Sequence, residues 1–214
     1  MNTPSRPSGT LPTALVLVAA FAAGLGLWAG QAYFARPAAV SVTSMRLLDA
    51  ARELPPFELR AADGGRIDAA TLAGRWTLVF LGFTHCPDIC PTTLAELARA
   101  EKLWANLPVE RRPRILFVSV DPERDTPEAL RKYAAYFSPT VLAATGDLDA
   151  LNRFAASLSM VFAKAPQADG DYTIDHTSWV AVLDDKARLT GFIRPPLDPG
   201  AIATDLQRLV ERAP

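Results

Sequence analysis

The sequence lacks the surplus of basic residues that a nucleic-acid-binding protein needs. Its 214 residues contain 22 Lys and Arg against 23 Asp and Glu, which gives a formal net charge of -1. Proteins that bind a phosphate backbone neutralise it with clustered Lys and Arg. We therefore expect no nucleic acid among the partners of this protein.

Cysteine and histidine are also scarce. Both cysteines fall within one pentapeptide, Cys86-Pro87-Asp88-Ile89-Cys90, so the fold cannot depend on a disulfide framework. The two histidines are His85 and His176. The side chains that could bind a soft metal are therefore few.

Charged residues are missing from one long stretch near the N-terminus. Residues 7–35 contain none, and residues 11–35 are dominated by apolar side chains. About 20 apolar residues suffice to cross a bilayer. Two interpretations remain open, an uncleaved transmembrane anchor and a signal peptide cleaved near Gly30-Gln31-Ala32. We favour the anchor, because the apolar run exceeds the roughly 7–15 residues of a signal-peptide core and ends in aromatic residues suited to a membrane interface.

This apolar segment divides the chain into four predicted regions. They are a short N-terminal tail at residues 1–10, the anchor at 11–35, a tether at 36–52 and a folded domain at 53–214, which has the size of a single domain. The N-terminus lacks the Arg- and Ser-rich amphipathic character of a mitochondrial presequence. We therefore expect a single-pass protein of a bacterial inner membrane whose domain faces the periplasm.

Runs of apolar residues predict a mixed α/β domain. Residues 76–83 and 114–120 are rich in Val, Leu and Phe, as in strands buried on both faces of a sheet, and helical spacing lies between them. Asp125-Thr126-Pro127-Glu128 has the capping-box pattern of a helix start. The other predicted elements are a small hairpin at 57–68, a strand at 141–144, a helix behind Asp147, an antiparallel pair at 179–193 and a last helix from Asp198. This order is that of a thioredoxin-like sandwich with a mixed central sheet.

The cysteine pair is predicted to lie where the first buried strand ends and the first helix begins. Open α/β sheets bind their ligands at this edge. Because proline is best tolerated at the first helical position, Pro91 predicts that Cys90 is the N-cap and that Cys86 lies in the preceding loop. A loop placement lets the two sulfurs form a disulfide or share a metal. The positive end of the helix dipole favours the thiolate that both chemistries need.

His176 is the candidate third ligand. We expect it to open the strand that contains Trp179, and in a thioredoxin-like fold the start of that strand lies beside the cysteine loop. Two thiolates and an imidazole suit Cu(I), and Cu(II) could add water or a carboxylate. Zinc is the nearest rival, since a catalytic zinc could use these three ligands and water, although a structural zinc usually has four protein ligands.

Three separated motifs resemble those of the Sco/SenC family of copper chaperones. They are residues 83–92 (FTHCPDICPT), residues 118–127 (VSVDPERDTP) and Asp175-His176-Thr177. The resemblance covers nearly all of the domain after residue 50. It implies a thioredoxin-like fold, copper held by Cys86, Cys90 and His176, and delivery to the dinuclear copper centre in subunit two of cytochrome c oxidase. It also implies a thiol-reductase role that prepares that centre's cysteines. Another copper chaperone is the candidate donor.

Two other functions stay open beside the chaperone. One is a thiol:disulfide oxidoreductase in which Cys86 and Cys90 are catalytic, and the other is a copper or redox sensor. Against the enzyme, the spacing is Cys-x3-Cys where thioredoxins have Cys-x2-Cys, and no proline stands beside His176 where thioredoxins carry a cis-proline.

Further polar residues near the motifs are candidate accessory groups. Asp88 is expected either to bind Cu(II) or to cap the helix, and His85 to be a structural neighbour of the cysteines. Asp175 is a candidate for a supporting contact to the metal site. The carboxylates of residues 121–125 run directly into a predicted helix, so we expect capping there and no magnesium site.

Overall fold

A computed structural model describes residues 13–34, 41–167 and 170–212. The chain divides into two compact units, residues 1–39 and residues 40–214. The predicted N-terminal tail and the first five residues of the predicted tether lie outside the described residues.

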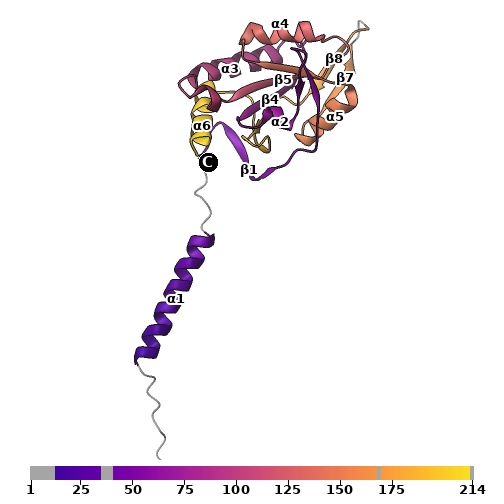
Figure 1. The fold of residues 1–214 in the computed structure, drawn as a ribbon. Coiled ribbons are helices and arrows are strands. Elements are labelled where there is room, and N and C mark those ends of the chain that lie inside the picture. The colour runs from indigo at the N-terminus through magenta and orange to yellow at the C-terminus, as the bar shows by residue number, and fades with distance from the viewer. Residues whose placement is uncertain (1–12, 35–40, 168–169, 213–214) are drawn as a thin grey trace, which may run out of the picture. The chain divides into compact units, whose positions relative to one another are not determined.

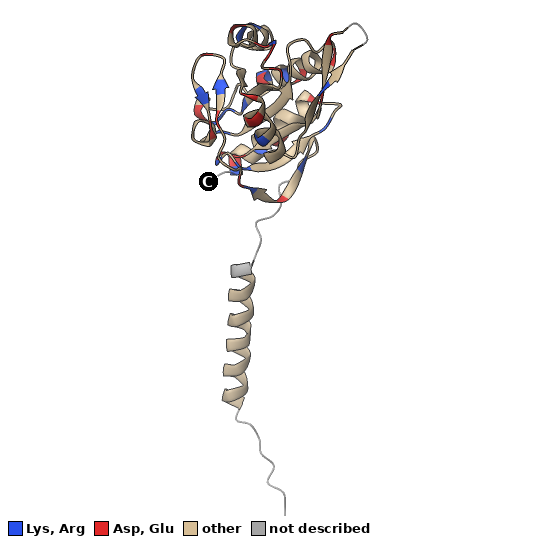
Figure 2. Ribbon diagram, turned by 90° about the vertical axis from the view of Figure 1, so that its right-hand side faces the viewer, with Lys and Arg blue, Asp and Glu red and all other residues tan. Residues whose placement is uncertain are grey.

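The first unit contains one long apolar helix, α1 (Thr13–Phe34). At 1.5 Å per residue its 22 residues extend about 33 Å, which matches a hydrocarbon core of about 30 Å. Residues Thr13–Gln31 have the length and composition of a membrane span. Figure 2 shows this helix without a charged residue. The predicted apolar helix is thus confirmed, while the choice between anchor and cleaved signal stays a prediction.

A mixed sheet forms the centre of the second unit (Figure 1). Its strand order is β1-β10-β9-β4-β5-β6-β2-β3. The parallel strands are β4 (Thr77–Gly82), β5 (Arg114–Ser119) and β6 (Leu142–Thr145), and the other pairings in this sheet are antiparallel. All of β4 is buried, as its apolar sequence predicts. The other strands are β1 (Met45–Arg52), β2 (Leu59–Ala61), β3 (Arg66–Ile67), β9 (Val180–Leu183) and β10 (Leu189–Ile193).

Helices cover both faces of this sheet. The first face carries α3 (Ile89–Leu103), α4 (Pro127–Phe137) and α6 (Pro199–Arg212), and the second carries α2 (Ala69–Leu72) and α5 (Leu148–Ser157). A single-turn helix, η1 (Val109–Arg111), precedes β5. Because α3 and α4 connect successive parallel strands, the loops that follow β4 and β5 emerge at the same edge of the sheet.

Strand β1 corrects the predicted tether at residues 36–52. It pairs antiparallel with β10, with Met45 opposite Ile193. Just before β1, the backbone N–H groups of Thr43 and Ser44 donate to the buried carboxylate of Asp205 in α6. Both donor–acceptor distances are 2.7 Å. The domain therefore includes residues that the sequence analysis assigned to the tether.

A second sheet of two strands was not predicted. Its strands β7 (Phe162–Pro166) and β8 (Tyr172–His176) pair antiparallel, with Phe162 opposite His176. The prediction that His176 opens the strand containing Trp179 is therefore wrong, because His176 ends β8. We call β7 and β8 together the histidine hairpin.

Candidate metal centre

The two cysteines lie at the carboxyl end of β4, as predicted, but the helix starts earlier than expected. Helix α3 begins at Ile89, so Asp88 and not Cys90 occupies the N-cap position. Pro91 is accommodated in the first turn, where backbone N–H groups have no helical partner to lose. Cys90 is therefore the second helical residue, and Cys86 lies in the loop before it.

The structure brings the three predicted ligand residues together. One ligand atom from each of Cys86, Cys90 and His176 lies within 4.8 Å of the other two. The Sγ atom of Cys90 is 3.4 Å from Nε2 of His176, although 86 positions separate them in the sequence. The loop after β4 and the end of the histidine hairpin thus form one cluster of soft donor atoms.

The imidazole of His176 is held with a defined nitrogen toward the sulfurs. Its Nδ1 atom is 3.1 Å from the carbonyl oxygen of Thr177. A carbonyl oxygen can only accept, so Nδ1 carries the proton and the lone pair of Nε2 faces Cys90. The rings of Phe80 and Phe83 approach the imidazole edge-on, with centroids at 5.8 and 6.1 Å. Burial lowers the pKa of His176, which favours the neutral form that binds metals.

Burial has the opposite effect on the pKa of Cys90. The residue is fully buried, and the loss of solvent raises the pKa of its thiol well above the ordinary value. The helix dipole was expected to favour the thiolate, but desolvation outweighs it here. Both cysteines are free thiols, so the predicted disulfide is not formed in this structure. A bound cation would replace the Cys90 proton and stabilise the thiolate.

Gly82, the last residue of β4, gives Cys90 the space it occupies. A Cβ atom at this position would lie 2.7 Å from the Cys90 sulfur and 2.9 Å from a ring carbon of Phe117. Such contacts are too short for any real side chain, so the close approach of the sulfur requires glycine. No motif in the sequence indicates this residue, because only the folded structure shows which atoms face it.

The spacing of the donor atoms suits a single transition-metal ion. Bonds of about 2.3 Å to sulfur and 2.0 Å to nitrogen place two ligands of one ion roughly 3.5 to 3.7 Å apart. The Cys90–His176 separation of 3.4 Å is close to this value. Little rearrangement would be needed for both atoms to bind the same ion.

Comparison with known proteins assigns the chain to a family. The model of the SCO1/SenC family matches residues 46–211. The chain belongs to the SCO1/SenC family. The match covers all three candidate ligands and starts within β1, in agreement with the corrected domain boundary.

Relatives of this SCO1/SenC protein occur in bacteria and mitochondria. A Stutzerimonas stutzeri protein is 34% identical over 82% of this chain and 86% of its own length. The mitochondrial SCO1 homolog of Homo sapiens is 32% identical over 81% of this chain but only 58% of its own length. The structure of Bradyrhizobium japonicum ScoI, solved with copper bound, has a TM-score of 0.66 and 34% identity and covers 72% of this chain and 97% of ScoI. The thioredoxin-like fold is thereby confirmed.

The predicted accessory residues lie near the SCO1/SenC site without joining the cluster of donor atoms. Asp88 is exposed and makes no side-chain cap hydrogen bond. Asp175 is exposed and precedes His176 in β8, so its side chain points to the opposite face of the strand. His85 contacts Thr84 Oγ1 at 3.1 Å and Asp125 at 3.6 Å, and its structural role stays a prediction.

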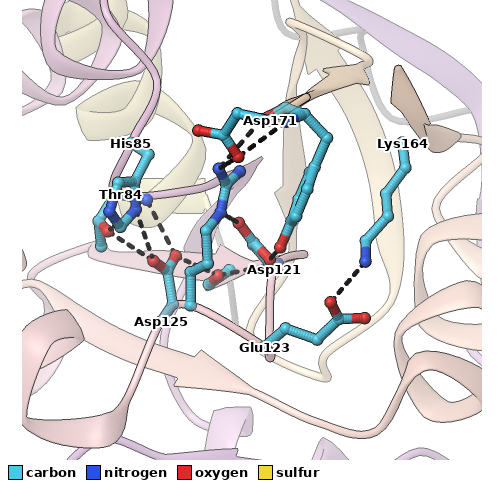
Figure 3. A network of polar contacts seen from close by, with 10 residues as sticks. Thr84, His85, Asp121, Glu123, Asp125, Lys164 and Asp171 are labelled. Atoms are coloured by element: carbon cyan, nitrogen blue, oxygen red, sulfur yellow. Dashed lines mark hydrogen bonds and ion pairs between the residues drawn. The ribbon is translucent and has the colours of Figure 1, made fainter. Parts of the chain in front are cut away.

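The carboxylates of residues 121–125 have a different role from the predicted helix capping. Thr126 caps α4 by accepting from the N–H of Ala129. Asp125 instead accepts from the backbone N–H of Thr84 at 2.9 Å and from the hydroxyl of Ser119 (Figure 3). The local pattern predicted a cap because nothing in the sequence indicates that Thr84, 41 positions away, is the partner.

Proposed function

We propose that this SCO1/SenC protein is a copper metallochaperone that binds one copper ion through Cys86, Cys90 and His176. The observation that carries the proposal is the convergence of one nitrogen and two sulfur atoms within 4.8 Å. Copper bound to a ScoI protein of 34% identity supports it. Two thiolates and a neutral imidazole are ligands that Cu(I) favours, and Cu(II) could add water.

We propose that copper is delivered from the side of Cys86, the less buried cysteine of the site. Cys90 is buried, whereas Cys86 is only half buried at the start of the cluster. A partner's thiolate could therefore reach copper from the Cys86 side and replace one ligand at a time. We propose that the acceptor is the dinuclear copper centre in subunit two of cytochrome c oxidase, as family membership implies, and that another copper chaperone is the donor.

A series of single variants tests copper binding. We expect one tight Cu(I) site in the reduced protein, measured by competition with a chromophoric Cu(I) chelator. Cys86→Ser, Cys90→Ser and His176→Ala each remove a donor atom and should weaken binding at least tenfold. His85→Ala removes the other histidine of the chain and should keep the site. A reduced wild-type protein without a tight one-to-one site would defeat the proposal.

The physiological role is tested in cells. Deletion of the gene should lower cytochrome c oxidase activity, and added copper should restore part of it if the protein supplies metal. The His176→Ala variant, expressed at the wild-type level, should behave like the deletion. Loss of oxidase activity that copper cannot restore would argue against delivery.

A second candidate function is thiol:disulfide exchange. The two free sulfurs lie within 4.8 Å of each other, and Cys86 is the less buried of the two cysteine residues. In this reaction Cys86 attacks a partner disulfide and Cys90 resolves the mixed disulfide. One Cys86–Cys90 disulfide and two partner thiols result, so two electrons pass to the partner. His176→Ala separates the functions, because copper affinity should fall strongly while dithiol reduction of a model disulfide persists.

We propose that α1 anchors the protein in a bacterial inner membrane with the domain in the periplasm. The length and composition of Thr13–Gln31 support the anchor. A C-terminal alkaline phosphatase fusion should be active, since this reporter requires the periplasm. N-terminal sequencing of the mature protein should find residues before α1, and a mature terminus near Ala32 would show a cleaved signal instead.

A further inference from the structure

The histidine hairpin needs its own attachment to the domain. Its two strands pair with each other, and neither pairs with a strand of the main sheet in the described residues. His176 ends β8, and Tyr172 begins it four residues earlier. Ile174, between these two residues, is buried in the core of the domain, and contacts to Tyr172 add a second anchor to the strand that carries the imidazole.

Arg124 makes several contacts to the start of β8, within the polar network of Figure 3 that includes Asp121 and Asp171. Its guanidinium donates to the backbone carbonyl of Tyr172 at 3.0 Å and to Asp171 at 3.3 Å. The same group stacks over the ring of Tyr172, 3.7 Å from the centroid. One arginine thus contacts the backbone and the ring of the residue that starts β8.

A buried carboxylate completes the attachment. Asp121 is fully buried and accepts from Nε of Arg124 at 2.6 Å and from the hydroxyl of Tyr172 at 2.8 Å. Burial and this hydrogen bond raise the pKa of Tyr172 to about 12, so the hydroxyl remains a donor at neutral pH. Arg124 provides the positive charge in contact with Asp121, and its loss would leave a buried charge without compensation.

The same loop also holds the cysteine side of the site. Asp125, next to Arg124, accepts from the backbone N–H of Thr84, two residues before Cys86. Its side chain is fully buried and also contacts His85. The five residues 121–125, which we call the brace loop, therefore contact both segments that supply the candidate ligands.

We propose that the brace loop positions the two halves of the metal site, and that Arg124 is the positioning residue for His176. The inference rests on the proposed copper site and adds a residue that does not itself bind the ion. Asp125 holds the segment before the sulfurs, and Arg124 holds the strand of the imidazole. Loss of Arg124 should therefore loosen the nitrogen ligand and leave both sulfur ligands in place.

Arg124→Gln tests this role, with Arg66→Gln as the matched control. Arg66 lies on β3 at the edge of the main sheet, pairs with Glu58 at 3.5 Å and is well exposed. Exposed ion pairs of this kind contribute little to stability. Arg124→Gln should lower Cu(I) affinity about tenfold, at the smaller end of the roughly 10- to 100-fold losses that follow removal of direct partners of metal ligands, because Arg124 acts on His176 through β8. Arg66→Gln should keep the Cu(I) affinity of the wild type.

Two readouts separate positioning from general stability. X-ray absorption of the Cu(I) form of Arg124→Gln should retain two sulfur ligands and lose nitrogen scattering. In the metal-free protein, hydrogen exchange should accelerate in β8 and remain slow in β4 and β5. Unchanged copper affinity and unchanged exchange in β8 would overturn the inference, and so would equal acceleration throughout the domain.

A second variant keeps the test decisive if Arg124→Gln does not fold. Tyr172→Phe removes only the hydroxyl that donates to Asp121, and it should weaken Cu(I) binding severalfold with faster exchange in β8. A wild-type Cu(I) affinity together with a wild-type rate of hydrogen exchange in β8 would overturn the inference. If the wild-type protein itself binds no copper, the proposed function fails, while the exchange measurement still decides the role of the brace loop.

Discussion

At the residue scale, protonation of Cys90 opposes binding of a metal ion at the proposed site. Its thiol is buried without solvent and is therefore harder to ionise than an exposed cysteine. His176 is already neutral, because burial lowers its pKa. A metal ion thus competes with a proton at the sulfur and not at the imidazole near neutral pH.

Copper affinity should consequently rise with pH through the neutral range. Because the pKa of Cys90 is raised, this thiol is protonated across that range and must lose its proton to bind copper. Calorimetry in buffers of different ionisation enthalpy should detect at least one proton released per copper. The lowered pKa of His176 means that its protonation competes only in more acidic solution. Affinity independent of pH between 6 and 8 would contradict this expectation.

Gly82 provides a second residue-scale prediction. In Gly82→Ala the new Cβ would meet the Cys90 sulfur and the Phe117 ring, both under 3 Å away. We expect a loss of about 1 to 3 kcal/mol in the free energy of unfolding, measured by urea denaturation, together with weaker copper binding. Gly146→Ala is the control, because its nearest contacts would be 3.4 Å or longer. Equal effects of both substitutions would show that Gly82 has no special relation to the site.

The ligand residues could be anticipated from the sequence, but their surroundings could not. Cys86, Cys90 and His176 could be predicted as ligands because the chain has only two cysteines and two histidines, and because these three residues lie in local motifs. The role of Gly82 depends on a sulfur eight positions away that folds back against it. Arg124 stood within a recognised motif, yet its partners on the histidine hairpin lie 47 and 48 positions further along the chain.

At the scale of elements, buried strands were predicted well and exposed strands poorly. β4 and β5 are continuous apolar runs, which indicate burial on both faces. β1 has the sequence MRLLDAAR, whose charges and small residues give no clear alternation, and only its pairing with β10 identifies it as a strand. The strands of the histidine hairpin are short and mostly half buried or exposed, with a proline at the end of β7.

Removal of β1 provides an element-scale test of the corrected boundary. A fragment of residues 53–214 lacks the strand that pairs with β10 and leaves Asp205 buried without its donors Thr43 and Ser44. We expect it to unfold at clearly lower urea concentration than a fragment of residues 40–214. Equal unfolding midpoints would restore the original interpretation of residues 36–52 as a tether.

At the scale of the whole molecule, the chain combines an apolar helix with a domain that contains all three candidate ligands. All three candidate ligands come from residues 40–214, which form one compact unit. Copper binding should therefore not depend on α1. The proposed anchoring by α1 would confine the site to a membrane and would raise the local concentration of the proposed chaperone near a membrane-bound acceptor such as the proposed oxidase subunit.

The most direct measurement is X-ray absorption on the reduced, copper-loaded domain. The predicted spectrum has one copper with two sulfur ligands and one nitrogen ligand, and His176→Ala should remove the nitrogen contribution while both sulfurs remain. A wild-type spectrum with sulfur ligands only, or one that His176→Ala leaves unchanged, would contradict the three-ligand site.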